Sequence, residues 1–152
     1  MSVAFRRDSD EEHREPEFEL PIPLGPNLVT ARGLALIEER LAAVTAAIAA
    51  SDDVDLLKKL RREQRYWSTR HATAELAPPP EPGVGGIGSH VTVRRNGTEQ
   101  SFTIVGHDEA DPPAGLLAFT APLARAVMGA QEGERVAVAG VPDAAELLAV
   151  AP

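Results

Sequence analysis

The stretch LALIEERLAAVTAAI, residues 34–48, decides the fold of the first half of this chain. Its apolar residues recur at spacings of 3, 4, 3 and 4 residues: Leu34, Ile37, Leu41, Val44 and Ile48. This heptad pattern is typical of a helix with one apolar seam. Thr30 precedes it and is a residue type that caps the start of helices. The stretch therefore predicts an amphipathic helix that needs a partner along one side.

A second heptad pattern begins after the short link Ser51–Asp53. Its seam positions are Leu57, Leu60, Gln64, Trp67, His71 and Ala74. Because so short a link allows only antiparallel packing, Ile48 should face Leu57, and Ile37 should face Trp67. Each arm has roughly 20 residues, or about 30 Å of helix. Residues 30–77 are therefore predicted to form an antiparallel coiled-coil hairpin.

The segment before the hairpin, residues 1–29, has the composition of an arm. It carries 7 acidic and 3 basic residues and four prolines, at positions 16, 21, 23 and 26. Such a segment forms no helix and buries little apolar surface, so it should be mostly disordered. The spaced apolar residues of Phe18–Leu24 leave a second interpretation open, in which this part lies extended against a surface groove.

Residues 78–152 read as a linker and a small sheet domain. The Pro- and Gly-rich stretch 78–86 ends the second helix and is the predicted linker. In residues 87–152, alternating stretches at 89–95 and 99–105 flank Asn96-Gly97, the strongest short hairpin signal. Further predicted elements are a loop at 106–115, strands at 116–119, 135–138 and 146–150, and a short helix from Leu123 to Ala130 that Pro122 starts. The fold class is therefore α+β.

Composition limits the classes of protein that this chain can belong to. Of its 152 residues, 43% are hydrophobic, 25% are charged and none is cysteine, which fits one or two small soluble domains without disulfides or cysteine-type zinc sites. The longest apolar runs are too short for a membrane span, and Met1–Glu15 is charged where a secretory signal is apolar. A cytoplasmic location is expected. The net charge of −8 argues against direct binding of DNA or broad binding of RNA.

No arrangement in the sequence is typical of an enzyme. The histidines, at positions 13, 71, 90 and 107, show no metal-ligand spacing, and we expect His71, on the hairpin seam, to be a packed or half-buried imidazole rather than a ligand. The glycines of residues 83–88 do not join a strand to a helix, as a phosphate-binding loop would. We therefore expect no catalytic activity and no cofactor of its own.

Two groups of charged residues near the hairpin tip could take part in binding or chemistry. Asp52, Asp53 and Asp55 could hold a hard cation weakly, or Ser51 or Asp52 could cap the second helix while the other carboxylates favour its positive end. Next to them lies a basic row: Lys58, Lys59, Arg61, Arg62 and Arg65. It is either a solvated face or a patch for an acidic wall or RNA.

Three stretches in the second half together resemble the GreA/GreB family of bacterial transcript cleavage and elongation factors. They are Ile87–Val93, Phe102–Pro112 and Ala121–Gly129, the last followed by Glu132–Val136. Their order and spacing also match, and Leu28–Leu34 resembles the start of the family's hairpin.

The resemblance implies a fold and a partner. The C-terminal domain would be FKBP-like, that is, similar to FK506-binding proteins, and would dock on RNA polymerase beside its secondary channel. The hairpin would enter the channel, where tip acids help the polymerase's magnesium to cut backtracked RNA. The chain would then contact nascent RNA only indirectly.

The resemblance also implies site residues, with departures from the family pattern. The cleaving members' tip motif is absent, so Asp53 is placed nearest the first acid, with a possible shared Mg²⁺, and Asp52 and Asp55 are substitutes. Each arm is also shorter by about three turns, which is similar to the non-cleaving nucleoside diphosphate kinase regulator type.

For polymerase binding the resemblance implies the junction residues Thr120, Pro122, Leu123 and Arg125. For the loop acids, Asp108, Glu109 and Asp111, turn formation with solvation and contact with the polymerase both stay open.

Two other classes of function stay open from the residues alone. One is an FKBP-like peptide-binding or chaperone module, although Phe102 and Phe119 are the only aromatic residues in the predicted domain. The other is an interaction protein whose hairpin dimerises through its seam. Polar Gln64 and His71 weaken such a seam, so a monomer is expected.

Overall fold

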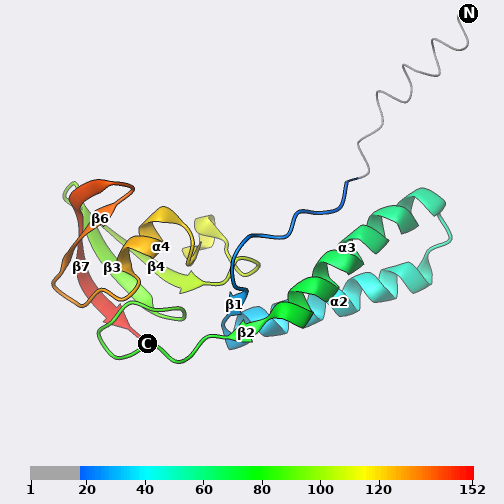
Figure 1. Cartoon of the computed structure of the whole chain (residues 1–152), viewed down its shortest axis with the longest axis horizontal. Coiled ribbons are helices and arrows are strands. Elements are labelled where there is room, and N and C mark those ends of the chain that lie inside the picture. Colours follow the sequence, from blue (N-terminus) through cyan, green and yellow to red (C-terminus); the bar gives the residue numbers. More distant parts are fainter. Residues whose placement is uncertain (1–17) are drawn as a thin grey trace, which may run out of the picture.

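The computed structural model describes residues 18–152 and shows an elongated molecule with a helical hairpin at one end and a β-sheet at the other (Figure 1). The predicted α+β class is confirmed. Among the described residues, no helix is long and apolar enough to cross a lipid bilayer.

The hairpin consists of helices α2 (Ala31–Ala50) and α3 (Val54–Thr73). Thr30 caps α2 as predicted, because its hydroxyl accepts a hydrogen bond of 2.9 Å from the amide of Gly33. Ile37 and Val44 of the predicted seam are buried between the helices. The two arms are antiparallel and lie side by side along their length (Figure 1).

His71 matches the half-buried form of its prediction. Its side chain is 46% exposed and lies 3.8 Å from Glu38, at the edge of the hairpin. Near the end of a two-helix pair, no third element covers the outer flank of the seam position, and a polar ring stays in water.

The chain segments that enter and leave the hairpin are hydrogen-bonded to each other. Strand β1 (Leu28–Val29) runs parallel to strand β2 (Glu75–Leu76). The amide of Glu75 donates to the carbonyl of Asn27, and that of Ala77 to the carbonyl of Val29, both at 2.9 Å. The end of the predicted disordered arm is thus ordered, which corrects that prediction for residues 27–29. Residues 1–17 of the arm lie outside the described residues.

The sheet has the strand order β5-β4-β3-β7-β6. Its strands are β3 (His90–Arg95), β4 (Thr98–Val105), β5 (Leu116–Ala118), β6 (Arg135–Val138) and β7 (Val141–Ala151). All neighbours are antiparallel except β4 and β5. All five strands were predicted. Strand β7 begins five residues earlier than predicted, because Ala139 and Gly140, both at positive φ, join it to β6 in a tight hairpin.

The core of this domain lies between the sheet and the short helix α4 (Pro122–Val127). Phe102, Ile104 and Leu147 of the sheet are essentially inaccessible to solvent, as is Val127 of the helix. Helix α4 ends three residues earlier than predicted, because Gly129 takes the left-handed conformation (φ 77°) that ends helices. The loop 106–115 holds an unpredicted 3-10 turn, η1 (Pro112–Ala114).

The predicted linker, residues 78–86, does not hang free at its C-terminal end. The amide of Gly129 donates to the carbonyl of Gly85 at 2.8 Å, and the amide of Gly85 donates to the carbonyl of Ala130 at 2.9 Å. A Cβ atom on Gly85 would lie 2.0 Å from the carbonyl oxygen of Val127, so only glycine fits there. This part of the linker is therefore held on the sheet domain.

Candidate functional site

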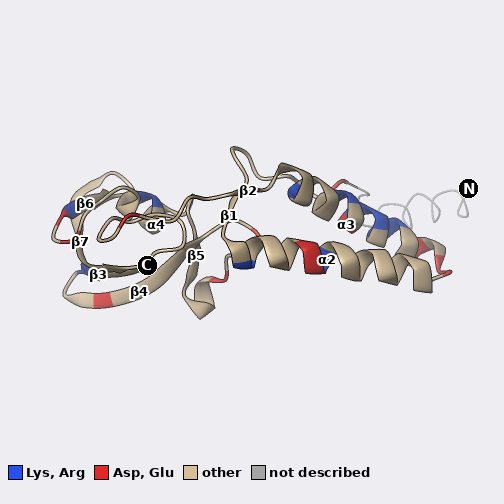
Figure 2. Ribbon diagram, turned by 90° about the horizontal axis from the view of Figure 1, so that it is seen from below, with Lys and Arg blue, Asp and Glu red and all other residues tan. Residues whose placement is uncertain are grey.

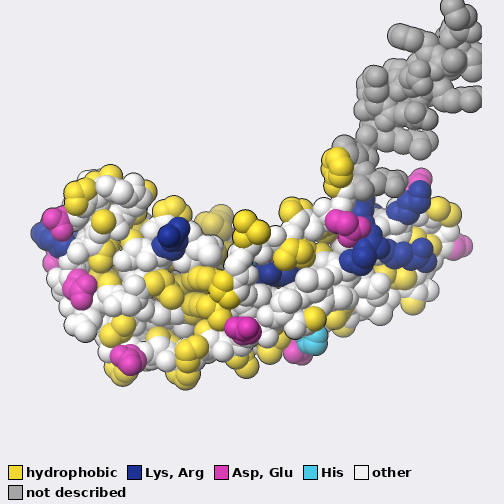
Figure 3. Space-filling view, viewed as in Figure 1, with side chains coloured by type: hydrophobic (Ala, Val, Ile, Leu, Met, Phe, Trp, Pro, Cys, Tyr) yellow, Lys and Arg dark blue, Asp and Glu magenta, His cyan; other side chains and the backbone are white. Residues whose placement is uncertain are grey.

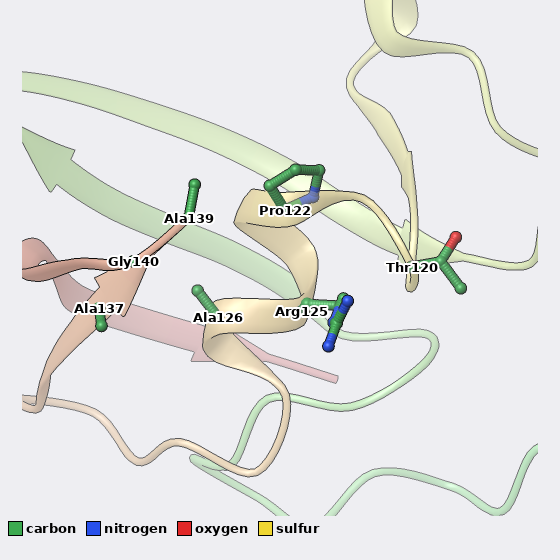
Figure 4. Close-up of a pocket in the computed structure, with 7 residues that line it drawn as sticks. All are labelled: Thr120, Pro122, Arg125, Ala126, Ala137, Ala139 and Gly140. Atoms are coloured by element: carbon green, nitrogen blue, oxygen red, sulfur yellow. The ribbon is translucent and has the colours of Figure 1, made fainter.

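Three of the four predicted docking residues line one hollow on the sheet domain. Thr120, Pro122 and Arg125 form one wall of a cavity of about 390 Å³. Figure 4 shows Ala137 of β6, with Ala139 and Gly140 of the β6–β7 turn, on the opposite side. The small residues leave room, and the guanidinium of Arg125 supplies a charge at the rim. The site suits an apolar side chain with an acidic neighbour.

Local structure explains how α4 presents these residues. Pro122 is the first helical residue, where its missing N–H costs nothing, and the amide of Arg125 donates to the carbonyl of Ala121 at 2.8 Å. Ala121, where the family pattern has a hydroxyl, makes no side-chain cap. The hydroxyl of exposed Thr120 lies beside the hollow instead (Figure 4).

Leu123 is placed differently from the other three. Its side chain is 8% exposed and belongs to the core with Val127. Any role that it has in binding acts through the position of α4, because it does not line the hollow.

The hairpin tip brings the predicted acids together, and they are exposed. Asp53 is the N-cap of α3: its Oδ1 accepts from the amides of Asp55 at 3.0 Å and Leu56 at 3.3 Å. The prediction that Ser51 or Asp52 caps this helix is wrong by one or two positions. Ser51 instead accepts from the amide of Asp53 at 3.2 Å. Within residues 18–152, no group of three or more His, Cys, Asp or Glu side chains is arranged to hold a metal ion.

The basic row predicted beside the tip lies along α3 (Figure 2). Four of its members line one surface hollow together with Glu19 from the segment before β1: Lys58, Arg61, Arg62 and Arg65. Figure 3 shows this dense patch of positive side chains with an acidic side chain among them. We call this patch the basic face.

The docking hollow and the hairpin tip lie at opposite ends of the molecule (Figures 1 and 2). What fixes their relative position is a polar joint between α3 and the loop after β4. Arg70 and Asp108, whose side chains are 3% and 4% exposed, form an ion pair of 2.6 Å. Arg70 also donates to Asn27 at 2.7 Å, and Asn27 donates back to the carbonyl of Arg70 at 2.8 Å.

Two further hydrogen bonds tighten the joint. The hydroxyl of Tyr66 donates to Asp108 at 2.5 Å, and that of Thr30 donates to Glu109 at 2.5 Å. Burial, and then the hydrogen bond to the Asp108 carboxylate, raise the pKa of Tyr66 above its usual value of 10. The phenol is therefore a donor across the neutral pH range. For Asp108 and Glu109, solvation is the wrong interpretation, because both carboxylates point into the joint.

Sequence reasoning missed the joint. The sequence gives a partial indication of the joint. Asp108 and Glu109 belong to the Phe102–Pro112 stretch, and Arg70 is a charged residue near the end of the second helix. Nothing in the sequence says that these charges meet.

Comparison with known proteins finds matches to part of the chain. Residues 80–147 match the family model described as the transcription elongation factor GreA/GreB C-terminal domain. The transcription elongation factor GreA of Bacillus anthracis is 43% identical over 54 residues, which cover 34% of each chain. That of Hyphomonas neptunium is 44% identical over 55 residues, or 35% of each chain. The matched stretch thus spans about a third of the length of these curated relatives.

The matches among solved structures include the GreA factor homolog 1 protein of Thermus thermophilus. It is 18% identical, with a TM-score of 0.40, covering 84% of this chain and 100% of that one. A transcription elongation factor GreA/GreB from Nitrosomonas europaea is 15% identical, with a TM-score of 0.40, covering 85% of this chain and 100% of that one.

Proposed function

We propose, from the premise that the chain belongs to the GreA/GreB family through its C-terminal domain, that it is an elongation regulator that binds bacterial RNA polymerase. In this proposal the sheet domain docks beside the secondary channel in the cytoplasm and the hairpin enters the channel. The protein acts as a monomer and an accessory factor, without chemistry or cofactor of its own.

The observation that carries the proposal is the hollow beside α4. It lies within the residues that match the family model, and it gathers Thr120, Pro122 and Arg125 around a space bounded by alanines. A hollow of this size with one cation at its rim can take an apolar side chain next to a carboxylate of a protein partner.

Docking is tested with Arg125→Glu in the whole protein. The variant reverses a charge on an exposed side chain without touching the core, so the fold should be kept. We expect loss of binding to RNA polymerase core enzyme in a fluorescence titration. Arg95→Glu, at the far end of β3, is the matched control and should bind normally. Equal binding by both variants would contradict the site. Leu123→Asp is unsuitable, because it would place a charge in the core.

The role of the tip is the finer part of the proposal. Exposed Asp52, Asp53 and Asp55 would approach the polymerase's own Mg²⁺, with Asp53 closest, and help it to activate a water. A second candidate is a regulator that occupies the channel without stimulating cleavage. The cap made by Asp53 favours this candidate, because its Oδ1 already accepts two amides.

Cleavage of RNA in a backtracked elongation complex separates the two candidates. Faster cleavage that is lost when all three tip aspartates become alanine supports shared metal chemistry. Inhibition of an established cleavage factor, without cleavage, supports channel occupation. If neither effect occurs at concentrations where binding is saturated, both candidates are wrong.

An FKBP-like peptide-binding module has less support. The hollow has no aromatic lining, and Phe102 is 1% exposed in the core. Measurable turnover of a proline-containing peptide by the protein would support this function instead.

A further inference from the structure

The described part of the segment before β1 is attached to helix α3 at its start. The carboxylate of Glu19 accepts two hydrogen bonds from Arg65 of the basic face, from Nε to Oε2 at 2.9 Å and from Nη2 to Oε1 at 2.5 Å. One turn earlier on the same helix, Arg62 donates to the backbone carbonyl of Phe18 at 3.3 Å. Two consecutive residues of the segment are thus held by two arginines of α3.

The same segment is attached to α3 at its other end. The side-chain amide of Asn27 donates to the carbonyl of Arg70 at 2.8 Å and to the hydroxyl of Thr73 at 3.2 Å. Between these two attachments the chain runs beside α3 (Figure 1). Residues 18–27 therefore belong to the side of the hairpin and are carried wherever the hairpin goes.

The apolar side chains of this segment remain in solvent. Phe18 is 74% exposed and Leu24 is 97% exposed, and Leu20 and Ile22 are each more than 40% exposed. A segment that used α3 as an apolar groove would bury these side chains. The second interpretation of Phe18–Leu24 is therefore correct in its extended path and wrong in its chemistry. Single exposed apolar residues are ordinary, but four within seven residues are typical of an interaction site. We call these four residues the apolar row.

The backbone of the segment is prepared for binding. Pro21 and Pro23 fix their own φ at about −65°, and a residue that precedes a proline is restricted to extended conformations. The segment therefore loses little conformational entropy when it binds. The two prolines have no N–H to donate to a strand of a partner, which favours recognition of the side chains by an apolar groove.

We propose that the apolar row is a second contact with RNA polymerase, in which it lies extended in an apolar groove of the polymerase beside the hairpin. This inference rests on the proposed function, in which the hairpin is inside the channel and carries the segment with it. The hollow beside α4 and the apolar row then hold the polymerase at two separate places. Two linked contacts bind more tightly than either contact alone.

The contact is tested with the triple variant Leu20→Ser, Ile22→Ser and Leu24→Ser in the whole protein. The three side chains are exposed, so the fold should be kept, and circular dichroism checks this. We expect about tenfold weaker binding of RNA polymerase core enzyme, since apolar residues buried in an interface commonly contribute more than 1 kcal/mol. Leu76→Ser, 60% exposed on β2, is the matched control and should bind normally.

The outcomes of this titration separate the inference from the proposed function. If the natural protein does not bind the polymerase, both are wrong. If the triple variant binds as tightly as the natural protein, or if Leu76→Ser loses as much affinity, only the second contact is wrong. Sedimentation tests the other occupant of the apolar row, a second copy of this chain. Self-association of the natural protein that is absent in the triple variant would overturn the proposal.

Exclusion of water from the apolar row can be followed directly. The chain has no cysteine, so an environment-sensitive dye can be placed at Leu24→Cys alone. Its emission should shift to shorter wavelength when polymerase core enzyme is added, whereas the same dye at Leu76→Cys should not respond. No shift at Leu24→Cys at saturating polymerase would show that the segment stays in solvent.

The attachment at Glu19 is tested with Glu19→Ala, which releases the start of the segment and leaves Arg65 in place. We expect about threefold weaker binding of the polymerase, because a loose segment must be ordered when it binds. If Arg65 itself contacted the polymerase, removal of Glu19 would free it and tighten binding. Tighter or unchanged binding would therefore overturn the proposal that the hairpin presents the apolar row.

Discussion

Arg65 and Arg70 lie five residues apart on the same helix, and each holds a carboxylate, but in opposite surroundings. The Arg70–Asp108 pair is 3% and 4% exposed and joins the hairpin to the sheet domain. The Arg65–Glu19 pair is 54% and 62% exposed and joins the hairpin to the segment before it. Loss of one partner from a buried ion pair strongly lowers the free energy of unfolding, whereas the partners of an exposed pair exchange readily with water and salt ions. The same chemistry therefore makes a permanent joint at one place and a reversible contact one and a half turns away.

The largest effect should follow from breaking the buried pair. Asp108→Asn leaves the Arg70 guanidinium buried without a counter-charge, and removal of one partner of such a pair costs about 3–5 kcal/mol of folding free energy. Urea denaturation followed by circular dichroism measures this. Arg65→Gln is the matched control on the same helix and should leave the denaturation midpoint unchanged. Equal effects of the two substitutions would remove the contrast between the pairs.

The next largest effect should come from the backbone contact at the same joint. A Cβ atom on Gly106 would lie 2.5 Å from the carbonyl oxygen of Leu28 in β1, and the backbone there cannot rotate away. Overpacking of this kind costs about 1–3 kcal/mol. Gly106→Ala should therefore destabilise the protein in the same denaturation experiment, and it should increase amide hydrogen exchange in β1 and β2. Exchange rates unchanged from those of the natural protein would show that β1 is not held at Gly106.

A smaller effect is expected at the hairpin tip, far from the joint. Asp53→Ala removes the two hydrogen bonds that cap α3, and loss of such a cap costs about 1 kcal/mol. Asp52→Ala is the matched control, since the side chain of Asp52 is not the cap. If both substitutions are equally mild, Asp53 is not held as a cap and its carboxylate is as available to a metal as that of Asp52.

The smallest effect concerns protonation of the exposed pair. The pKa of Glu19 is lowered, chiefly by the hydrogen bond from Arg65, so the contact is present above pH 4.5 and is lost as the pH falls through the lowered value. The carboxyl carbon signal of Glu19 should titrate at lower pH in the natural protein than in Arg65→Gln. Coincident titration curves would mean that the pair does not form in solution.

The sequence predicts elements that depend on near neighbours. The heptad spacing from Leu34 to Ile48 predicts α2, and Asn96-Gly97 predicts the β3–β4 turn, because these patterns act over a few residues. The cap of α3 is missed by one or two positions, since adjacent aspartates compete for the same role. The end of α4 is missed by three positions, where Gly129 takes the left-handed conformation. The predicted docking residues and tip acids stay predictions about function.

The joint could not be predicted, because its partners are far apart in sequence. Arg70 and Asp108 are separated by 38 residues, and Thr30 and Glu109 by 79. Their meeting depends on how two folded parts approach each other, and local periodicity carries no information on that. The same applies to Glu19 and Arg65, where only the opposite net charges of the two segments hint at contact.

The parallel pairing of β1 with β2 has a consequence for the evolution of the hairpin. The pairing of β1 with β2 joins the two ends of the hairpin. The sheet domain therefore contacts the same base of the hairpin whatever the length of the helices beyond it. Seven residues inserted into each helix near the tip would preserve the seam and add about 10 Å of reach. Insertions or deletions near the tip can therefore change how far the hairpin extends, while the contacts between its base and the sheet domain stay the same.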